Sequence, residues 1–254
     1  MDNINSIVEK FIEPYKQDNN ILAAFLTGSY AVGNQNDYSD IDIFLVSSDE
    51  LKWRERGNRI ISEHLVEYFI NPSKKLFEEM NNEIKTNDRV TSTIIANGKI
   101  LFDKINIIEK LHKRAIEVIK SPLILLDNNE IERIKYFTHY YFDQLTRAYK
   151  TDKNEFWYLY YTFLEHLIYS YGKYKGIILS PRTKIYKYIE DGKYKINESF
   201  KKLNDKKYLK LLIDCMKKNE AKIMYKNIYE LKEYQQKIMG GFNIDGWKIK
   251  SEIN

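Results

Sequence analysis

The sequence has very little cysteine: Cys215 is the only one among 254 residues. A single thiol forms no internal disulfide, and it excludes a structural zinc site built from several thiolates. No apolar run approaches the roughly 20 residues that a membrane-spanning helix needs. The first residues, MDNINSIVEKF, lack the basic-then-apolar layout of a secretory signal. We therefore expect a cytoplasmic protein that does not enter a membrane.

Neither sign of charge is in large excess, since 41 basic and 36 acidic residues give a formal net charge of +5. The chain is nearly balanced up to about residue 103, whereas lysines crowd residues 173–250. Such a lysine-rich half is either a surface for phosphates or nucleic acid, or a set of ordinary solvated helix faces. Because Ile, Asn, Lys and Tyr are abundant throughout, we favour solvated faces over a nucleic-acid partner.

Short apolar runs alternate with helical patterns in the first hundred residues. Apolar side chains recur at helical spacing over residues 3–18, and a turn signal, Asn71-Pro72, starts another helix. A polar, amphipathic helix is expected over residues 49–63. Buried strands are expected at residues 21–26, 41–46 and 65–70, with a short fourth at 100–102. This alternation predicts an α/β domain with a mixed or parallel sheet over residues 1–104.

From about residue 105 the apolar spacing is helical throughout, with aromatic side chains on the buried faces. Helices are expected over residues 109–120, 129–149 and 155–174, and two more over 203–239 before Gly240-Gly241. No strand signal follows Phe102. The sequence predicts an all-α helical-bundle domain over residues 105–254. Because no Gly/Ser/Pro-rich joint separates the two domains, we expect them to pack closely.

The segment GSYAVGNQNDYSDIDIFLV, residues 28–46, has the pattern of a phosphate site. Gly28 and Ser29 follow a predicted strand and open a helix or tight turn. A glycine lets the backbone approach a ligand closely, and amides at a helix start point outward with a partial positive charge. The Ser29 hydroxyl offers one more hydrogen bond. We expect this turn to hold phosphate groups.

Asp40 and Asp42 stand at the head of the second predicted strand. Residues two apart on a strand project from the same face, roughly 6.5 to 7 Å apart. Carboxylate oxygens suit magnesium, and paired ions about 3.5–4 Å apart clamp the attacking and leaving oxygens of an in-line phosphoryl displacement. Ile41 and Ile43 point the other way and anchor the strand. The motif within this strand context predicts a two-magnesium site.

Glu67 is the best candidate for a third carboxylate, because it is the one charge within the strand-like run at residues 65–70. Burying that acid alone would be costly, so it faces solvent, a partner or a metal. If its strand neighbours the second strand, Glu67 completes the metal cage or accepts the proton of an acceptor hydroxyl. The alternative is that it faces water on a half-exposed sheet. We favour the site, given two acids nearby.

Gly28-Ser29 and Ser39-Asp40-Ile41-Asp42 resemble the signature of the DNA-polymerase-β-type nucleotidyltransferase superfamily. Within that superfamily the arrangement is similar to the bacterial aminoglycoside and lincosamide nucleotidyltransferases. The resemblance implies that Gly28, Ser29 and Ser39 lie at a nucleoside triphosphate and that Asp40 and Asp42 bind magnesium. It implies a further acid from the next strand, a place that Glu67 fits, although the family often has aspartate there.

The resemblance also assigns roles to the two predicted domains: residues 1–104 are the catalytic domain and residues 105–254 a helical domain that binds the acceptor. Family members supply a basic residue from the helical domain, and Lys184 resembles one. A helix capped around Pro181 explains the segment Ser180-Pro181-Arg182-Thr183-Lys184 equally well. Related antibiotic-modifying enzymes often build the acceptor site across a dimer, so a homodimer is one alternative and the oligomeric state stays open.

Glu165 and His166 lie on a helix crowded with aromatic residues. A carboxylate there acts as a base or recognises a positively charged amino-sugar, whereas a helical core with tyrosine hydroxyls at its rim is the simpler interpretation and the one we favour. The choice of general base between Glu67 and Glu165 stays open. The remaining histidines with no ligand spacing are expected to be structural: His64, His112 and His139.

The sequence thus predicts a magnesium-dependent nucleotidyltransferase that moves a nucleoside monophosphate from an NTP to a hydroxyl of a small molecule. AMP from ATP is the favoured donor chemistry, and an aminoglycoside or lincosamide antibiotic is the model acceptor. One alternative is a macromolecular acceptor, either a protein, as in nucleotidylating antitoxins, or an RNA. Another is a non-catalytic nucleotide sensor, which the retention of three carboxylates disfavours.

Overall fold

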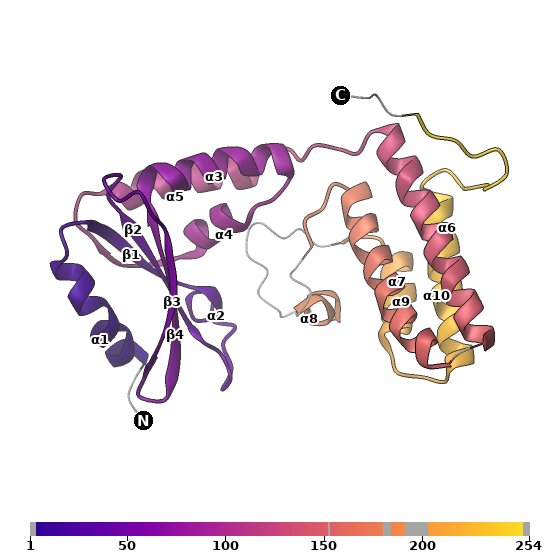
Figure 1. The fold of residues 1–254 in the computed structure, drawn as a ribbon, viewed down its shortest axis with the longest axis horizontal. Coiled ribbons are helices and arrows are strands. Elements are labelled where there is room, and N and C mark those ends of the chain that lie inside the picture. The colour runs from indigo at the N-terminus through magenta and orange to yellow at the C-terminus, as the bar shows by residue number, and fades with distance from the viewer. Residues whose placement is uncertain (1–3, 152, 180–183, 191–202, 251–254) are drawn as a thin grey trace. The chain divides into compact units, whose positions relative to one another are not determined.

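The computed structural model describes residues 4–151, 153–179, 184–190 and 203–250 (Figure 1). These residues divide into two compact units, the first ending at Pro122 and the second beginning at Leu123. Each unit is described by itself below. Within the described ranges, no helix is both long enough and apolar enough to cross a membrane.

The first unit is a five-stranded sheet with helices on both faces, as Figure 1 shows. The strands lie in the order β3-β4-β2-β1-β5. Only β2 and β4 pair in parallel, and the other neighbours are antiparallel, which confirms the predicted mixed sheet. Its elements are α1 (Ile4–Gln17), β1 (Ile21–Thr27), α2 (Gly28–Val32), β2 (Ile41–Ser47), β3 (Glu55–Ile61), β4 (His64–Pro72), α3 (Ser73–Thr86), α4 (Val90–Asn97), β5 (Lys99–Asp103) and α5 (Ile107–Lys120).

The central strand β2 sends alternate side chains into two separate cores. Ile41, Ile43 and Leu45 pack with the apolar face of α1. Phe44 and Val46 pack on the other side, where α3, α4 and α5 supply the covering side chains. Because a strand alternates its faces, Asp42 lies on the same side as Phe44. The strand is therefore anchored on both faces while its first residues carry carboxylates.

Residues 49–63 do not form the expected amphipathic helix. The structure has strand β3 there, joined to β4 by Ser62 and Glu63, which both adopt positive φ, at 49° and 66°. Two consecutive residues of that kind form the tight turn that matches the twist of a hairpin. β3 is an edge strand whose residues are nearly all exposed or partly exposed. Because both faces of β3 are exposed to solvent, its sequence lacks the alternation of apolar and polar residues that would identify a strand.

The unit boundary also differs from the predicted one at residue 104. The change to helical spacing at residue 105 is real, since α5 follows β5 there. However, α5 buries Ile108, Leu111 and Ala115 in the core on the sheet. The first compact unit therefore includes α5 and ends at Pro122.

The described part of the second unit is entirely helical, which confirms the predicted fold class. Its main core consists of aromatic and aliphatic side chains from α6, α7, α9 and α10, with Tyr160, Tyr171 and Tyr208 fully buried. The hydroxyls of Tyr160 and Tyr208 donate hydrogen bonds to the carbonyls of Cys215 and Leu167, at 2.8 and 3.0 Å. Its helices are α6 (Asn128–Thr151), α7 (Lys153–Tyr174), α8 (Ile185–Glu190), α9 (Lys206–Met216) and α10 (Ala221–Ile238).

Candidate nucleotide and metal site

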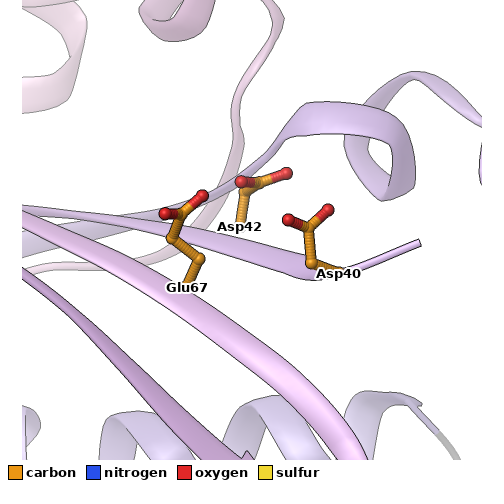
Figure 2. A group of neighbouring side chains, drawn as sticks. All are labelled: Asp40, Asp42 and Glu67. Carbon is orange, nitrogen blue, oxygen red and sulfur yellow. The ribbon is translucent and has the colours of Figure 1, made fainter. Parts of the chain in front are cut away.

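Three carboxylates of the first unit converge near the start of β2 (Figure 2). Asp42 of β2 stands opposite Glu67 of β4 in the parallel register, so the two side chains share a face of the sheet. Asp40 directly precedes β2. One oxygen from each acid lies within 4.8 Å of the others, and all three residues are partly buried. The register of two central strands therefore gathers the acids that the sequence singled out.

Gly28 makes room for this cluster. It starts α2 with φ at +62°, a backbone conformation that strains any residue with a Cβ. A Cβ added there would stand 1.8 Å from Oδ2 of Asp42. The backbone of Gly28 thus lies directly against the Asp42 carboxylate. This places the turn between β1 and α2 beside the acids, so one ligand could contact both.

The two serines of the motif differ in what their hydroxyls contact. Oγ of Ser29 is buried and has no hydrogen-bond partner in the structure. Buried hydroxyls are normally satisfied, so this one has a hydrogen bond still to make. Oγ of Ser39 instead accepts a hydrogen bond from the backbone N–H of Asn36, at 2.9 Å. Ser39 thereby closes the turn that leads into Asp40.

Glu67 has an ion-pair partner that the sequence analysis missed. Nε and Nη2 of Arg56 both donate to Oε1 of Glu67, at 2.9 and 2.5 Å. Arg56 lies on β3, which was expected to be a helix, so its alignment with Glu67 was hidden. The hairpin turn at Ser62 and Glu63 is what brings this arginine beside the acid. A search for a two-residue turn before residues 65–70 could have found the pairing.

The donor set fits a hard divalent cation. Carboxylate oxygens are the ligands that magnesium prefers. Like charges within 4.8 Å of one another repel, and the ion pair with Arg56 offsets part of this repulsion at Glu67. Further positive charge would therefore stabilise the cluster. Together with the unpartnered Oγ of Ser29, the residues present suit a metal-bound phosphate ligand.

The other predicted site residues lie in the second unit. Lys184 is exposed and stands just before α8, while residues 180–183 of the same motif lie outside the described residues. Glu165 and His166 line a cavity of about 590 Å³ beside Phe137, Tyr141 and Tyr169.

His166 is a buried residue in the wall of that cavity. Its Nε2 lies 2.9 Å from Oγ1 of Thr138, and its ring packs edge-on against Tyr141. Burial lowers the pKa of His166 to about 4, and the positive charge of Lys173 adds to the effect. The imidazole is therefore neutral at physiological pH. This supports the structural interpretation of His166 over a charged one.

Comparison with known proteins supports the resemblance to the polymerase-β-type superfamily. Residues 9–106, which include Gly28, Asp40 and Asp42, match the polymerase beta nucleotidyltransferase family. The chain is 26% identical over 135 residues to a candidate protein adenylyltransferase of Methanocaldococcus jannaschii, a match that covers 50% of this chain and 92% of that protein. A nucleotidyltransferase-like protein from Exiguobacterium sibiricum matches 94% of this chain and 77% of its own, with a TM-score of 0.45 and 10% identity.

Proposed function

We propose that the protein transfers a nucleoside monophosphate, AMP in the first instance, from an NTP to an acceptor hydroxyl. The observation that carries the proposal is the convergence of Asp40, Asp42 and Glu67 beside the Gly28 turn. The proposal is supported by the position of these three acids within the segment that matches the nucleotidyltransferase family. Nucleotidyl transfer is the activity of that family, and the donor, metal and acceptor are the finer parts of the proposal.

Each residue of the site has a proposed part in the reaction. Asp40, Asp42 and Glu67 would hold magnesium, which when bound neutralises charge on the phosphates and orients the reacting oxygens. Gly28 and Ser29 would contact the triphosphate through the backbone and the unpartnered hydroxyl.

The transfer itself is an in-line displacement at the α-phosphorus. The acceptor oxygen forms a bond to this phosphorus, the bond to the bridging oxygen breaks, and pyrophosphate leaves. The acceptor proton passes to a carboxylate, for which Glu67 is the proposed candidate in the first unit. Lys184 and Glu165, in the second unit, remain proposed as a triphosphate contact and an alternative base.

A small-molecule acceptor is the first candidate, because the second unit contains a cavity of suitable size. Its volume of about 590 Å³ is within the range of ligand pockets. Its lining combines aromatic rings with two carboxylates, Glu130 and Glu165, and two cationic side chains, Arg133 and Lys173. These groups offer ring and charge contacts to a polar amino-sugar or a lincosamide. The second candidate is a protein hydroxyl, which the name of the Methanocaldococcus jannaschii relative favours.

Labelled nucleotide transfer tests the proposal directly. The protein is incubated with magnesium, each of four α-³²P-labelled NTPs, and either aminoglycosides and lincosamides or a cell extract. We expect a labelled product that requires magnesium and that falls about a thousandfold, or about 4 kcal/mol in barrier, in Asp42→Asn. The matched control, Asp214→Asn on α9, should retain the rate.

The assay also separates the alternatives. A labelled small molecule supports the first acceptor class, and a labelled polypeptide supports the second. Magnesium-dependent NTP binding with no product from any acceptor would instead indicate a nucleotide sensor and would overturn the catalytic proposal.

A further inference from the structure

We infer that Arg56 is a positioning residue that fixes the third carboxylate, Glu67, in the orientation that metal binding requires. The inference rests on the proposed function, because it assigns Glu67 to a metal site. Arg56 lies in the edge strand β3, next to the strand that carries Glu67. It would act through this carboxylate and not on the reacting atoms.

The sheet register puts Arg56 on the correct face. In the antiparallel pair of β3 and β4, Asn58 stands opposite Glu67 and Arg56 stands opposite Phe69. Arg56 is thus the diagonal neighbour of Glu67 on one face, within reach of a long side chain. Both of its donating nitrogens bond to the same oxygen, Oε1. The other oxygen, Oε2, receives neither of these bonds and remains available for a cation.

A glutamate at this position needs such a constraint. Its side chain has one more methylene group than aspartate, and fixing a longer polar side chain costs more rotamer entropy. The Glu67 side chain is only 17% exposed, but it must still select the rotamer that meets Asp42. An ion pair that exists before the metal arrives selects this rotamer in advance. The cation then encounters a prearranged set of oxygens.

Arg56 is itself held by aromatic packing. Its guanidinium lies over the ring of Phe69, 5.0 Å from the centroid. Phe69 stacks in turn on Phe44, with centroids 6.1 Å apart, and Phe44 is 5% exposed in the core beneath. A contiguous path of contacts therefore connects the core of the sheet to Oε1 of Glu67. The planar fork of arginine makes both the stacking and the double hydrogen bond, which a lysine does not.

Two physical effects of Arg56 on metal binding oppose each other, so an experiment can tell them apart. As a positive charge, Arg56 repels an incoming cation, and its removal alone would tighten binding. As a positioning residue, it orders Glu67, and its removal would weaken binding. Support for ordered ligands by surrounding hydrogen bonds typically contributes about 10-fold to 100-fold in metal affinity. Positioning is therefore expected to outweigh repulsion at this partly exposed site.

Manganese binding to the full-length protein, measured by electron paramagnetic resonance and by calorimetry, tests the inference without any assay of activity. We expect the Kd for Mn²⁺ to rise about tenfold in both Arg56→Gln and Arg56→Lys. Arg59→Gln is the matched control, because Arg59 pairs with Val66 and points to the other face of the same strand. Its Kd should stay unchanged. Thermal unfolding of each variant verifies that the fold is retained.

The outcomes distinguish failure of this inference from failure of the proposed function. Unchanged or tighter Mn²⁺ binding in folded Arg56→Gln would overturn the positioning role while leaving the metal site intact. Wild-type protein that binds no Mn²⁺, or Asp42→Asn that binds it equally well, would overturn the proposed metal site and the role of Arg56 with it.

Discussion

The carboxylates of the two units have very different surroundings. In the first unit, three acids lie within 4.8 Å of one another, and Arg56 forms an ion pair with one of them. In the second unit, Asp205 is a single acid that several hydrogen-bond donors surround. It accepts hydrogen bonds from the hydroxyls of Tyr171 and Tyr234 and from the backbone N–H of Tyr208, the first at 2.5 Å.

We interpret this difference as that between the proposed binding site and a structural contact. Donors already surround Asp205, which caps α9 and links it to α7 and α10. Polar groups with all their bonds made inside the fold stabilise it and need no ligand. Acids gathered within 4.8 Å of one another repel, and such clusters are typical of functional sites. Substitutions in the first unit should therefore impair activity most, and those in the second unit stability.

Outside the three carboxylates themselves, the largest effect is expected from Gly28→Ala, which would break the first half of this comparison. The new Cβ would overlap the Asp42 carboxylate and strain the backbone at φ +62°. We expect transfer activity to fall about a hundredfold or more, about 3 kcal/mol in barrier, measured with the labelled-nucleotide assay.

The matched control for Gly28→Ala is Gly241→Ala. Gly241 also has positive φ, at +81°, but an added Cβ would meet no atom within 4 Å. It should lose a little stability and no transfer rate. Equal activity loss in the two variants would show that backbone strain, and not displacement of Asp42, is responsible.

The sequence predicted that the acids lie together because two local patterns indicate it: the alternation of side chains along a strand, and the apolar runs around Asp42 and Glu67. The alternation of Asp40, Ile41 and Asp42 fixes which side chains share a face, and the apolar runs around Asp42 and Glu67 predict central strands. That the two strands are neighbours was assumed, and the structure bears it out. What these acids bind stays a prediction.

Arg56 and the extent of the first unit were missed for physical reasons. An edge strand exposed on both faces has no apolar alternation, so its polarity suggested a surface helix. α5 has a helical pattern like those of the second unit, and its packing on the sheet depends on tertiary contacts that spacing does not encode. The sequence also does not place Lys184 relative to the carboxylates, because that depends on how the two units are arranged.

A pH measurement sharpens the second half of the comparison at His166. The pKa of His166 falls from 6.5 to about 4 on folding, chiefly through burial. As the pH falls, the unfolded chain therefore takes up a proton on His166 before the folded protein does. The folded state keeps its full stability above pH 6.5 and loses part of it as the pH falls towards 4. Because one unit corresponds to about 1.4 kcal/mol, we expect the loss to reach at most about 3 kcal/mol.

Urea unfolding between pH 7 and pH 4 measures the effect at His166. The decline in unfolding free energy should be smaller in His166→Gln than in the wild type. The same substitution at the exposed His112 of α5 should leave the decline unchanged. Parallel pH profiles for wild type and His166→Gln would contradict a buried, neutral imidazole.

The smallest expected effect is that of Asp205→Asn, which tests whether a fully bonded acid is structural only. Burial pushes the pKa of Asp205 up, but the hydrogen bonds from Tyr171, Tyr208 and Tyr234, with the charge of Lys175, lower it overall. The charged form is thus favoured in the fold, and its contribution to stability is present above about pH 4 and lost below. An asparagine turns an NH₂ group towards these donors, which should cost about 1–2 kcal/mol in urea unfolding at pH 7. The transfer rate per folded molecule should stay unchanged. A fall of tenfold or more in this rate would show that Asp205 takes part in the reaction as well as in the fold.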